Sequence, residues 1–252
     1  MPDHIFTCLV FPHASADGAA NMALDEVLLE VVAGGPSGGA ALRTYGWTEA
    51  TLSLGYFQSI VPVEADPRWR DVPIVRRPTG GGAILHHHEV TYALAVARGH
   101  PLSRDGKHLY RAVHSWIGDL LRVFGVEAHR RGESRASTEG RPLLCFSDED
   151  AEDVVVGPIK VVGSAQRRRA GAILQHGSIL LSRSPLAPEL AGLADLGSFP
   201  SDAAGLAEII RRDLPKALGF APLSLEWPEP TKTGALKIEA EVYRSTAWTR
   251  RR

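Results

Sequence analysis

Short apolar runs bounded by glycine or polar residues constrain the fold of this chain more than any other feature. Runs of this kind are typical of buried strands. In the first half of the chain they predict strands at residues 4–11, 42–47, 51–57, 72–77, 83–85 and 90–96, the last two as a hairpin. Residues 20–32 instead predict a helix, because apolar side chains recur through the run while Asp25 and Glu26 lie early in it. The first half therefore predicts a sheet with one early helix.

The second half continues this mixture of strands and helices. Val113 and Ile117 belong to a set of apolar residues spaced as on one buried face of a helix, which predicts a helix over residues 110–124. Residues 130–142 are polar and basic and predict a mobile loop. The stretch from Pro222 has no clear core pattern. Further strands are expected at residues 154–159, 160–164 and 172–181, and a last helix at residues 203–218.

Composition places the chain among globular proteins. Its 252 residues, 44% of them hydrophobic, are enough for a substantial core, and we expect one domain over residues 1–252. With 28 Lys and Arg against 29 Asp and Glu, the net charge of −1 supplies no broad field for nucleic acid. No signal-peptide pattern or long uncharged apolar run is present, so we expect a cytoplasmic protein without a membrane partner. Cys8 and Cys145 alone cannot form a disulfide framework or a cysteine-built zinc site.

Cys145 and Lys160 are the strongest pointers to chemistry. Cys145 follows a small apolar step, and Lys160 opens the run Lys-Val-Val-Gly-Ser-Ala-Gln. A thiol of ordinary pKa, about 8.5, is only a few per cent thiolate at neutral pH, so a catalytic cysteine needs a nearby cation or base. Lys160 is a candidate for that cation. The alternative is that Cys145 is an inert buried residue, as free cysteines often are.

A run of three glycines, Gly80 to Gly82, follows Arg76 and Arg77 at the end of an expected strand. Adjacent glycines let the backbone approach a ligand closely and direct amides at an oxyanion or phosphate. The spacing fits neither a P-loop nor a dinucleotide-binding fingerprint. A plain structural turn remains an alternative, but the two arginines favour binding of an acidic group.

Histidines and arginines form two further clusters. His86 to His88 cannot converge on one metal ion, because consecutive side chains on a strand point to opposite faces; a structural role, loop support or a role as a base stays open. His176 lies in an apolar strand and is interpreted as a core histidine. Residues 166–169, Gln-Arg-Arg-Arg, predict either a solvated turn between strands or a docking site for an acidic carrier protein.

Taken together, these segments resemble the lipoate and biotin ligase superfamily, and within it the cysteine-dependent octanoyltransferases. The resemblance covers about residues 20–182. Its motifs occur in family order at residues 21–26, 76–83, 85–86, 89–92, 145–146, 160–166 and 174–179. Each motif alone is unspecific, but the set is highly specific.

The resemblance implies an α/β (α+β) catalytic core with a central, largely antiparallel or mixed sheet flanked by helices. It implies that Cys145 takes an octanoyl group from acyl carrier protein as a thioester and delivers it to a lysine of a lipoyl-domain protein, such as glycine cleavage H protein or a 2-oxoacid dehydrogenase E2. Lys160 would polarise the carbonyl, and amides near Gly163 and Ser164 would be oxyanion donors. The acyl and headgroup site would comprise Arg76, Gly80, Gly81, Gly82, His86, Gly163, Ser164, Ala165, His176 and Gly177. By this route neither a metal nor another cofactor is needed, and we expect a monomer.

Two alternatives stay open. The first is an ATP-dependent lipoate-protein ligase, which would use ATP and Mg²⁺ and form a lipoyl-adenylate. Pro158 and Ile159 stand where the family commonly has Gly-Arg, and Gly82 stands where octanoyltransferases often have arginine and ligases glycine. Against a ligase, only about 30 residues follow the last expected helix, too few for an independent accessory domain. The second alternative is a noncatalytic acyl-binding or carrier-binding module.

Overall fold

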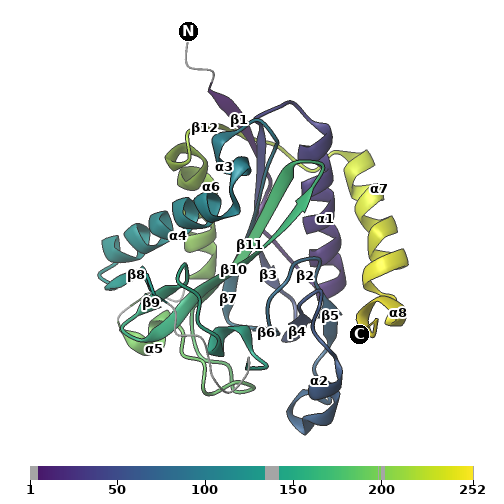
Figure 1. Cartoon of the computed structure of the whole chain (residues 1–252), viewed down its shortest axis with the longest axis vertical. Coiled ribbons are helices and arrows are strands. Elements are labelled where there is room, and N and C mark those ends of the chain that lie inside the picture. Colours follow the sequence, from purple (N-terminus) through teal and green to yellow (C-terminus); the bar gives the residue numbers. More distant parts are fainter. Residues whose placement is uncertain (1–4, 134–141, 198, 200–201, 252) are drawn as a thin grey trace.

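A large mixed β-sheet forms the centre of the molecule in the computed structural model, which describes residues 5–133, 142–197, 199 and 202–251 (Figure 1). The strand order is β12-β1-β3-β7-β11-β10-β9-β8, and β2 pairs with β3. Strand β1 runs parallel to β12 and β3, whereas the pairs from β3 through β8 are antiparallel. The strands are β1 (Phe6–Val10), β2 (Ala14–Ala16), β3 (Ala40–Trp47), β7 (Glu89–Val96), β8 (Ala128–Arg130), β9 (Val154–Val156), β10 (Ile159–Arg169), β11 (Ala172–Leu180) and β12 (Phe220–Ser224).

A second, three-stranded sheet lies beside it in the order β5-β4-β6. Its strands are β4 (Thr51–Leu54), β5 (Ile74–Arg76) and β6 (Ile84–His86). The glycine run, Gly80 to Gly82, lies in the connection between the end of β5 at Arg76 and the start of β6 at Ile84, so this small sheet positions the loop. The expected α/β class with a largely antiparallel or mixed sheet is confirmed.

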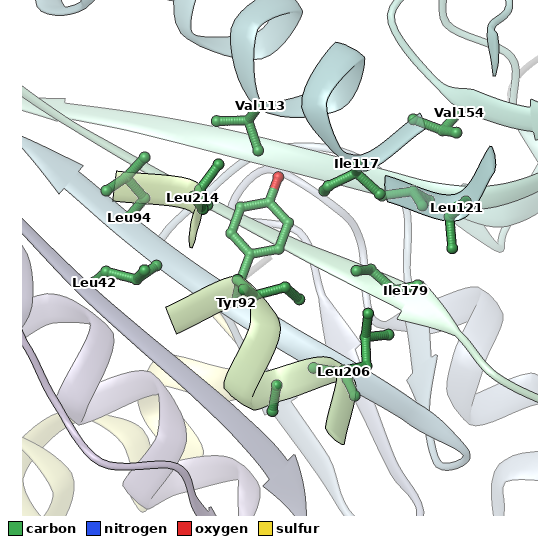
Figure 2. Packing of buried hydrophobic residues seen from close by; sticks show 14 of the residues in the cluster. Leu42, Tyr92, Leu94, Val113, Ile117, Leu121, Val154, Ile179, Leu206 and Leu214 are labelled. Carbon is green, nitrogen blue, oxygen red and sulfur yellow. The ribbon is translucent and has the colours of Figure 1, made fainter. Parts of the chain in front are cut away.

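Helices cover both faces of the large sheet. On one face, α4 (Gly106–Val123) and α6 (Ala203–Ala217) pack against Tyr92 and Leu94 of β7 (Figure 2). On the other face, α1 (Gly18–Gly34) packs against Ala93 and Ala95 of the same strand. Alternate residues of β7 thus enter different cores, which is why this strand is apolar at nearly every position.

The remaining helices are short or peripheral. Helix α7 (Glu229–Ile238) and a π-helical turn (Glu239–Tyr243) lie against the outer side of α1, and α8 (Thr246–Thr249) follows them and contacts β5 (Figure 1). The others are α2 (Val61–Ala65), α3 (Pro101–Arg104), α5 (Leu193–Leu196) and the 3-10 turns Pro67–Trp69 and Cys145–Ser147. None of the helices in the described part of the chain is long and apolar enough to cross a membrane.

Two sequence predictions are wrong in detail. Residues 83–85 and 90–96 do form strands, but not a hairpin: β6 pairs with β4, whereas β7 pairs with β3 and β11. Residues 166–169 are not a turn, because they continue β10 to Arg169 and the turn falls at Ala170 and Gly171, both with positive φ. The side chains of residues 166–169 donate hydrogen bonds to acceptors of the protein itself. The prediction of a solvated turn from this charge run is therefore wrong.

The helix and strand bounds otherwise follow the predictions within a few residues. The strand expected at 154–159 ends at Val156, because Gly157 turns the chain with φ 57°. The stretch from Pro222, which has no core pattern in the sequence, forms part of β12 and the C-terminal helices. Most of the loop predicted at residues 130–142 lies outside the described residues.

Candidate active site

Cys145 and Lys160 lie side by side. The Nζ of Lys160 is 3.9 Å from the Sγ of Cys145, and the same ammonium donates to the carbonyl oxygens of Cys145 (3.0 Å) and Asp148 (3.3 Å). It also forms an ion pair of 3.0 Å with Asp153. Cys145 is half-buried, whereas Cys8 is fully buried and burial raises the pKa of Cys8 to about 12. Of the two thiols, only Cys145 combines access to solvent with an adjacent cation, the combination that activates a thiol.

Strand β10 aims Lys160 at the cysteine. Its pairing with β9 shifts register between Lys160 and Val162, and such a bulge re-aims side chains. As a result Lys160 lies over Gly163, where a Cβ would be only 2.7 Å from its Cε. Glycine at 163 is therefore required for the lysine to fold back toward Cys145.

The glycine loop packs directly against Cys145. The amide of Cys145 donates to the carbonyl of Ala83 at 2.7 Å, which ties the 3-10 turn Cys145–Ser147 to the end of the loop. A Cβ at Gly81 would lie 3.8 Å from Sγ, and one at Gly82 would lie 3.3 Å from the amide nitrogen of Cys145. Gly81 also has a φ of 91°, a conformation that favours glycine. The space beside Sγ thus depends on Gly81 and Gly82 having no side chains. A Cβ at Gly80, in contrast, would meet nothing within 4 Å.

Arg77 holds the loop. The sequence analysis named it with Arg76 as favouring an acidic group but placed only Arg76 in the acyl and headgroup site. Its guanidinium donates to the carbonyls of Gly80 (2.6 Å) and Gly82 (2.7 Å) and to the backbone of Ser53. Burial lowers the pKa of Arg77, and negative charge on Cys145 opposes that shift. Arg76 points elsewhere, and its described hydrogen bonds run to backbone carbonyls that include those of Gly55, Gln58 and Thr249. Alternation along strand β5 was the available signal that the two arginines face different ways.

Beside the loop is a small cavity of about 10 Å³. His86, His176 and Gly177, three of the expected site residues, line it together with Arg77. The whole lining is Met22, Tyr45, Arg77, Ile84, His86, Thr91, His176, Gly177 and Ser178. The cavity therefore joins the small sheet, helix α1 and the large sheet at one point.

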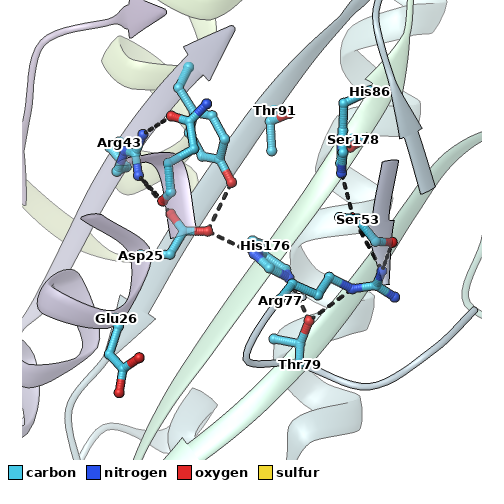
Figure 3. A network of polar contacts seen from close by, with 12 residues as sticks. Asp25, Glu26, Arg43, Ser53, Arg77, Thr79, His86, Thr91, His176 and Ser178 are labelled. Carbon is cyan, nitrogen blue, oxygen red and sulfur yellow. Dashed lines mark hydrogen bonds and ion pairs between the residues drawn. The ribbon is translucent and has the colours of Figure 1, made fainter. Parts of the chain in front are cut away.

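A buried chain of polar contacts surrounds this cavity (Figure 3). His176 hydrogen-bonds with Asp25 through Nδ1 and with Thr79 through Nε2, and Thr79 accepts from Arg77. His86 hydrogen-bonds with Ser53 and Glu89. The interpretation of His176 as a buried histidine agrees with this place, but its hydrogen-bond partners are polar side chains rather than an apolar core.

The ionisation of the cavity lining follows from its burial. Burial lowers the pKa of His86, although Glu89 opposes the shift. Burial alone would raise the pKa of Glu89, but His86, Thr91 and Ser178 hold it below its ordinary value. The neighbours of His86 point elsewhere. His87 and His88 stack on each other, His87 hydrogen-bonds with the hydroxyl of Ser184, and His88 donates to the carbonyl of Arg183. No cluster of three or more metal-ligating side chains occurs among the residues that the structure describes.

Ser164 faces the opposite side of the sheet from the glycine loop. Its Oγ hydrogen-bonds with Tyr92 and His114, each at 2.6 Å, and its carbonyl accepts from Tyr110. A Cβ at Gly177 would lie 2.1 Å from Ser164 Oγ, so Gly177 makes room for this serine. Gly163 and Ala165 pair with Ser178 and His176 on β11. The role of amides near Gly163 and Ser164 as oxyanion donors stays a prediction.

Asp153 is a second residue that the sequence analysis missed. It is 3% exposed and lies just before β9, within hydrogen-bond distance of Lys160. Burial raises its pKa, and the charge of Lys160 acts against that rise. It is one of five acidic residues between 148 and 153, and no pattern in the sequence distinguishes it from the other four.

Comparison with known proteins shows the family to which this chain belongs. The model of the lipoyl protein ligase A/B catalytic domain matches residues 17–191. Octanoyltransferase LipM of Geobacillus kaustophilus is 38% identical over 207 residues, which are 79% of this chain and 71% of that protein. Octanoyltransferase LipM of Kyrpidia tusciae is 41% identical over 202 residues, which are 75% of this chain and 70% of that protein.

Solved structures share the fold at lower identity. A putative lipoate protein ligase from T. acidophilum superposes with a TM-score of 0.76 and 18% identity, covering 98% of this chain and all of the other. A lipoate-protein ligase A bound with ATP gives a TM-score of 0.75 and 20% identity, covering 98% of this chain and 99% of that one. At this identity the likeness extends to the fold alone, so these structures do not favour ligation over transfer.

Proposed function

The chain belongs to the lipoyl protein ligase A/B catalytic-domain family and is an octanoyltransferase of protein lipoylation, and we propose that it carries the octanoyl group as a thioester on Cys145. The observation that carries this proposal is the 3.9 Å contact between Lys160 Nζ and Cys145 Sγ beside the glycine loop. A cation at this distance favours a thiolate and can stabilise negative charge that develops on a bound carbonyl oxygen.

The first half-reaction would load the enzyme. The thiolate of Cys145 attacks the carbonyl carbon of octanoyl acyl carrier protein, and Lys160 donates a hydrogen bond to the oxyanion of the tetrahedral intermediate. The carbon–sulfur bond of the donor then breaks, and the carrier leaves as a thiolate, which takes up from solvent a proton equivalent to the one that Cys145 released on forming its thiolate. One thioester replaces another, so this step is nearly isoenergetic.

The second half-reaction would unload it. The neutral amine of a lysine on a lipoyl-domain protein attacks the carbonyl carbon of the acyl-enzyme and loses a proton to solvent. The carbon–sulfur bond breaks, an amide forms, and the thiolate of Cys145 is released. Because an amide is more stable than a thioester, transfer runs downhill without ATP or a metal ion. The acceptor, whether glycine cleavage H protein or a 2-oxoacid dehydrogenase E2, belongs to this proposal, as does a cytoplasmic location.

The acyl chain would occupy the cavity lined by His86, His176 and Gly177. A volume of about 10 Å³ is close to that of a single water probe, so an eight-carbon chain can enter only if the lining side chains move. Met22 is the most adaptable of them, because its side chain is unbranched and flexible. Gly80 to Gly82 would leave the carbonyl exposed to Sγ, and Arg77 would hold that loop in place. We further propose that residues 1–252 act as one catalytic domain and as a monomer.

The direct test is octanoyl transfer from octanoyl acyl carrier protein to a lipoyl domain, measured with and without ATP. We expect equal rates in both conditions, and a loss of at least about 100-fold in Cys145→Ala. Cys8→Ala is the matched control, because it removes the other thiol and should retain transfer. Transfer that persists in Cys145→Ala would refute the acyl-enzyme. Formation of a lipoyl-adenylate from lipoate and ATP would instead support the ligase alternative.

A further inference from the structure

Asp153 makes the only ion pair of Lys160 among the described residues. Both side chains are 4% exposed, and Oδ1 of Asp153 lies 3.0 Å from Nζ. The other carboxylate oxygen, Oδ2, accepts from the amide of Asp150 at 2.8 Å. Asp153 is therefore fixed at both oxygens, and it can hold the lysine in one orientation.

Three oxygen atoms surround the ammonium of Lys160, and an acyl carbonyl would take the place of one of the two backbone carbonyls. An ammonium has three N–H groups. Here it meets Asp153 and the two carbonyl oxygens of Cys145 and Asp148 at 3.0–3.3 Å, whereas the sulfur lies farther away at 3.9 Å. The ammonium is thus oriented by oxygen atoms, and the thiol is its neighbour rather than its main partner.

We propose that Asp153 is a positioning residue that is the counter-ion of Lys160, keeps it directed at the acyl carbonyl, and prevents the thiolate of Cys145 from taking that place. The inference rests on the proposed thioester on Cys145 and extends it. Because Asp153 is the counter-ion of Lys160, its removal would leave the ammonium free to turn toward the sulfur.

The pairing with Asp153 does not depend on the state of the sulfur. After acyl transfer to sulfur the thiolate is gone, yet Asp153 still holds Lys160 in place for the second half-reaction.

Other groups face this pair from the neighbouring elements. They are Arg77 beyond the end of β5, Tyr110 and His114 on α4, and Asp148, Asp150 and Glu152 in the segment before β9. Burial raises the pKa of Tyr110 well above 10 and lowers that of His114 to about 4. Glu152 is paired with Arg111 and Arg130. Between pH 5 and 9, therefore, neither Tyr110 nor His114 changes charge.

The test uses Asp153→Asn, which keeps the volume and removes the charge. The rate of alkylation of Cys145 by iodoacetamide is followed against pH, with the modified cysteine identified by mass spectrometry. We expect the midpoint to move to lower pH by about one unit, because a negative charge near the thiolate is lost. We expect octanoyl transfer by the same variant to fall about 10- to 100-fold, because the lysine is no longer held in position.

Three comparisons make the outcome decisive. Asp153→Glu retains the charge and should return the alkylation midpoint to that of wild type. Asp119→Asn, an exposed acidic residue on α4, should change neither the midpoint nor the transfer rate. In a Lys160→Met background, Asp153→Asn should cause no further loss of transfer, because Asp153 acts through the lysine.

An unchanged or higher midpoint in Asp153→Asn, or undiminished transfer, would overturn the inference. So would an additional loss in the Lys160→Met background. If Asp153→Asn does not fold, the midpoint of Asp153→Glu and the transfer rate of the Lys160→Met pair decide it in the same way. Absence of an octanoyl adduct on wild-type Cys145 would instead refute the proposed function on which the inference rests.

Discussion

At the scale of single residues, the geometry of the candidate site depends on glycines as much as on Cys145 and Lys160. Gly81 and Gly82 bring the loop against Cys145, and Gly163 leaves room for the stem of Lys160. The sequence indicated Cys145 with Lys160 and the glycine run, because a cysteine, a candidate cation and consecutive glycines can be recognised without a structure. It could not indicate that Arg77 holds the glycine loop or that Asp153 pairs with Lys160, because these contacts are made only in the fold.

Gly163→Ala tests this dependence. The new Cβ would lie 2.7 Å from Lys160 Cε, near the end of a flexible side chain, so the lysine rather than the sheet should move. We expect a change in the free energy of unfolding of less than about 1 kcal/mol, because alanine also restricts the unfolded chain. We expect octanoyl transfer to fall about tenfold or more.

The control for this substitution is Gly234→Ala on α7, where a Cβ would meet nothing within 4 Å. It should leave transfer unchanged. Thermal unfolding and transfer are measured on both variants. Full transfer by Gly163→Ala would mean that the observed direction of Lys160 is not needed for catalysis.

At the scale of elements, strand β10 and helix α4 together hold the lysine. His114 on α4 donates from Nδ1 to the carbonyl of Glu152, and its Nε2 hydrogen-bonds with the hydroxyl of Ser164. It thus joins the segment that carries Asp153 to the strand that carries Lys160. Periodicity predicted α4 and its buried face, but the register shift in β10 had no signal in the sequence.

The stability of the protein should depend on His114 in acid. Burial lowers its pKa from 6.5 to about 4, so the unfolded chain binds this proton more readily than the folded one. Stability due to the neutral ring is present above pH 6.5 and is lost as the pH falls toward 4. With 1.36 kcal/mol per pKa unit, about 2 kcal/mol is lost between pH 7 and pH 5.

Urea unfolding at pH 7 and pH 5 measures this contribution. His114→Gln removes the titrating group, so its free energy of unfolding should fall less between the two pH values than that of wild type, by about 2 kcal/mol. His86 and other histidines with lowered pKa values remain in both proteins, so the difference isolates His114. An equal fall in both proteins would contradict this account.

At the scale of the whole molecule, the family resemblance predicted more than local pattern did. The order of motifs implied the α/β core, whereas the local pattern at residues 83–96 suggested a hairpin. Short strands do not specify their partners, and β6 and β7 join different sheets although only two residues separate them. The contact of Arg76 with Thr249 spans 173 positions, and nothing in the local sequence signals it.

The whole-molecule account rests on an acyl-enzyme that forms and is then consumed as fast as the octanoyl lipoyl domain is produced. Wild-type protein is mixed with octanoyl acyl carrier protein, and intact mass is followed before and after a lipoyl domain is added. We predict one octanoyl group on Cys145, formed without ATP and lost at the rate at which octanoyl lipoyl domain appears. Product that accumulates without this adduct, or an adduct that the lipoyl domain does not consume, would contradict the account.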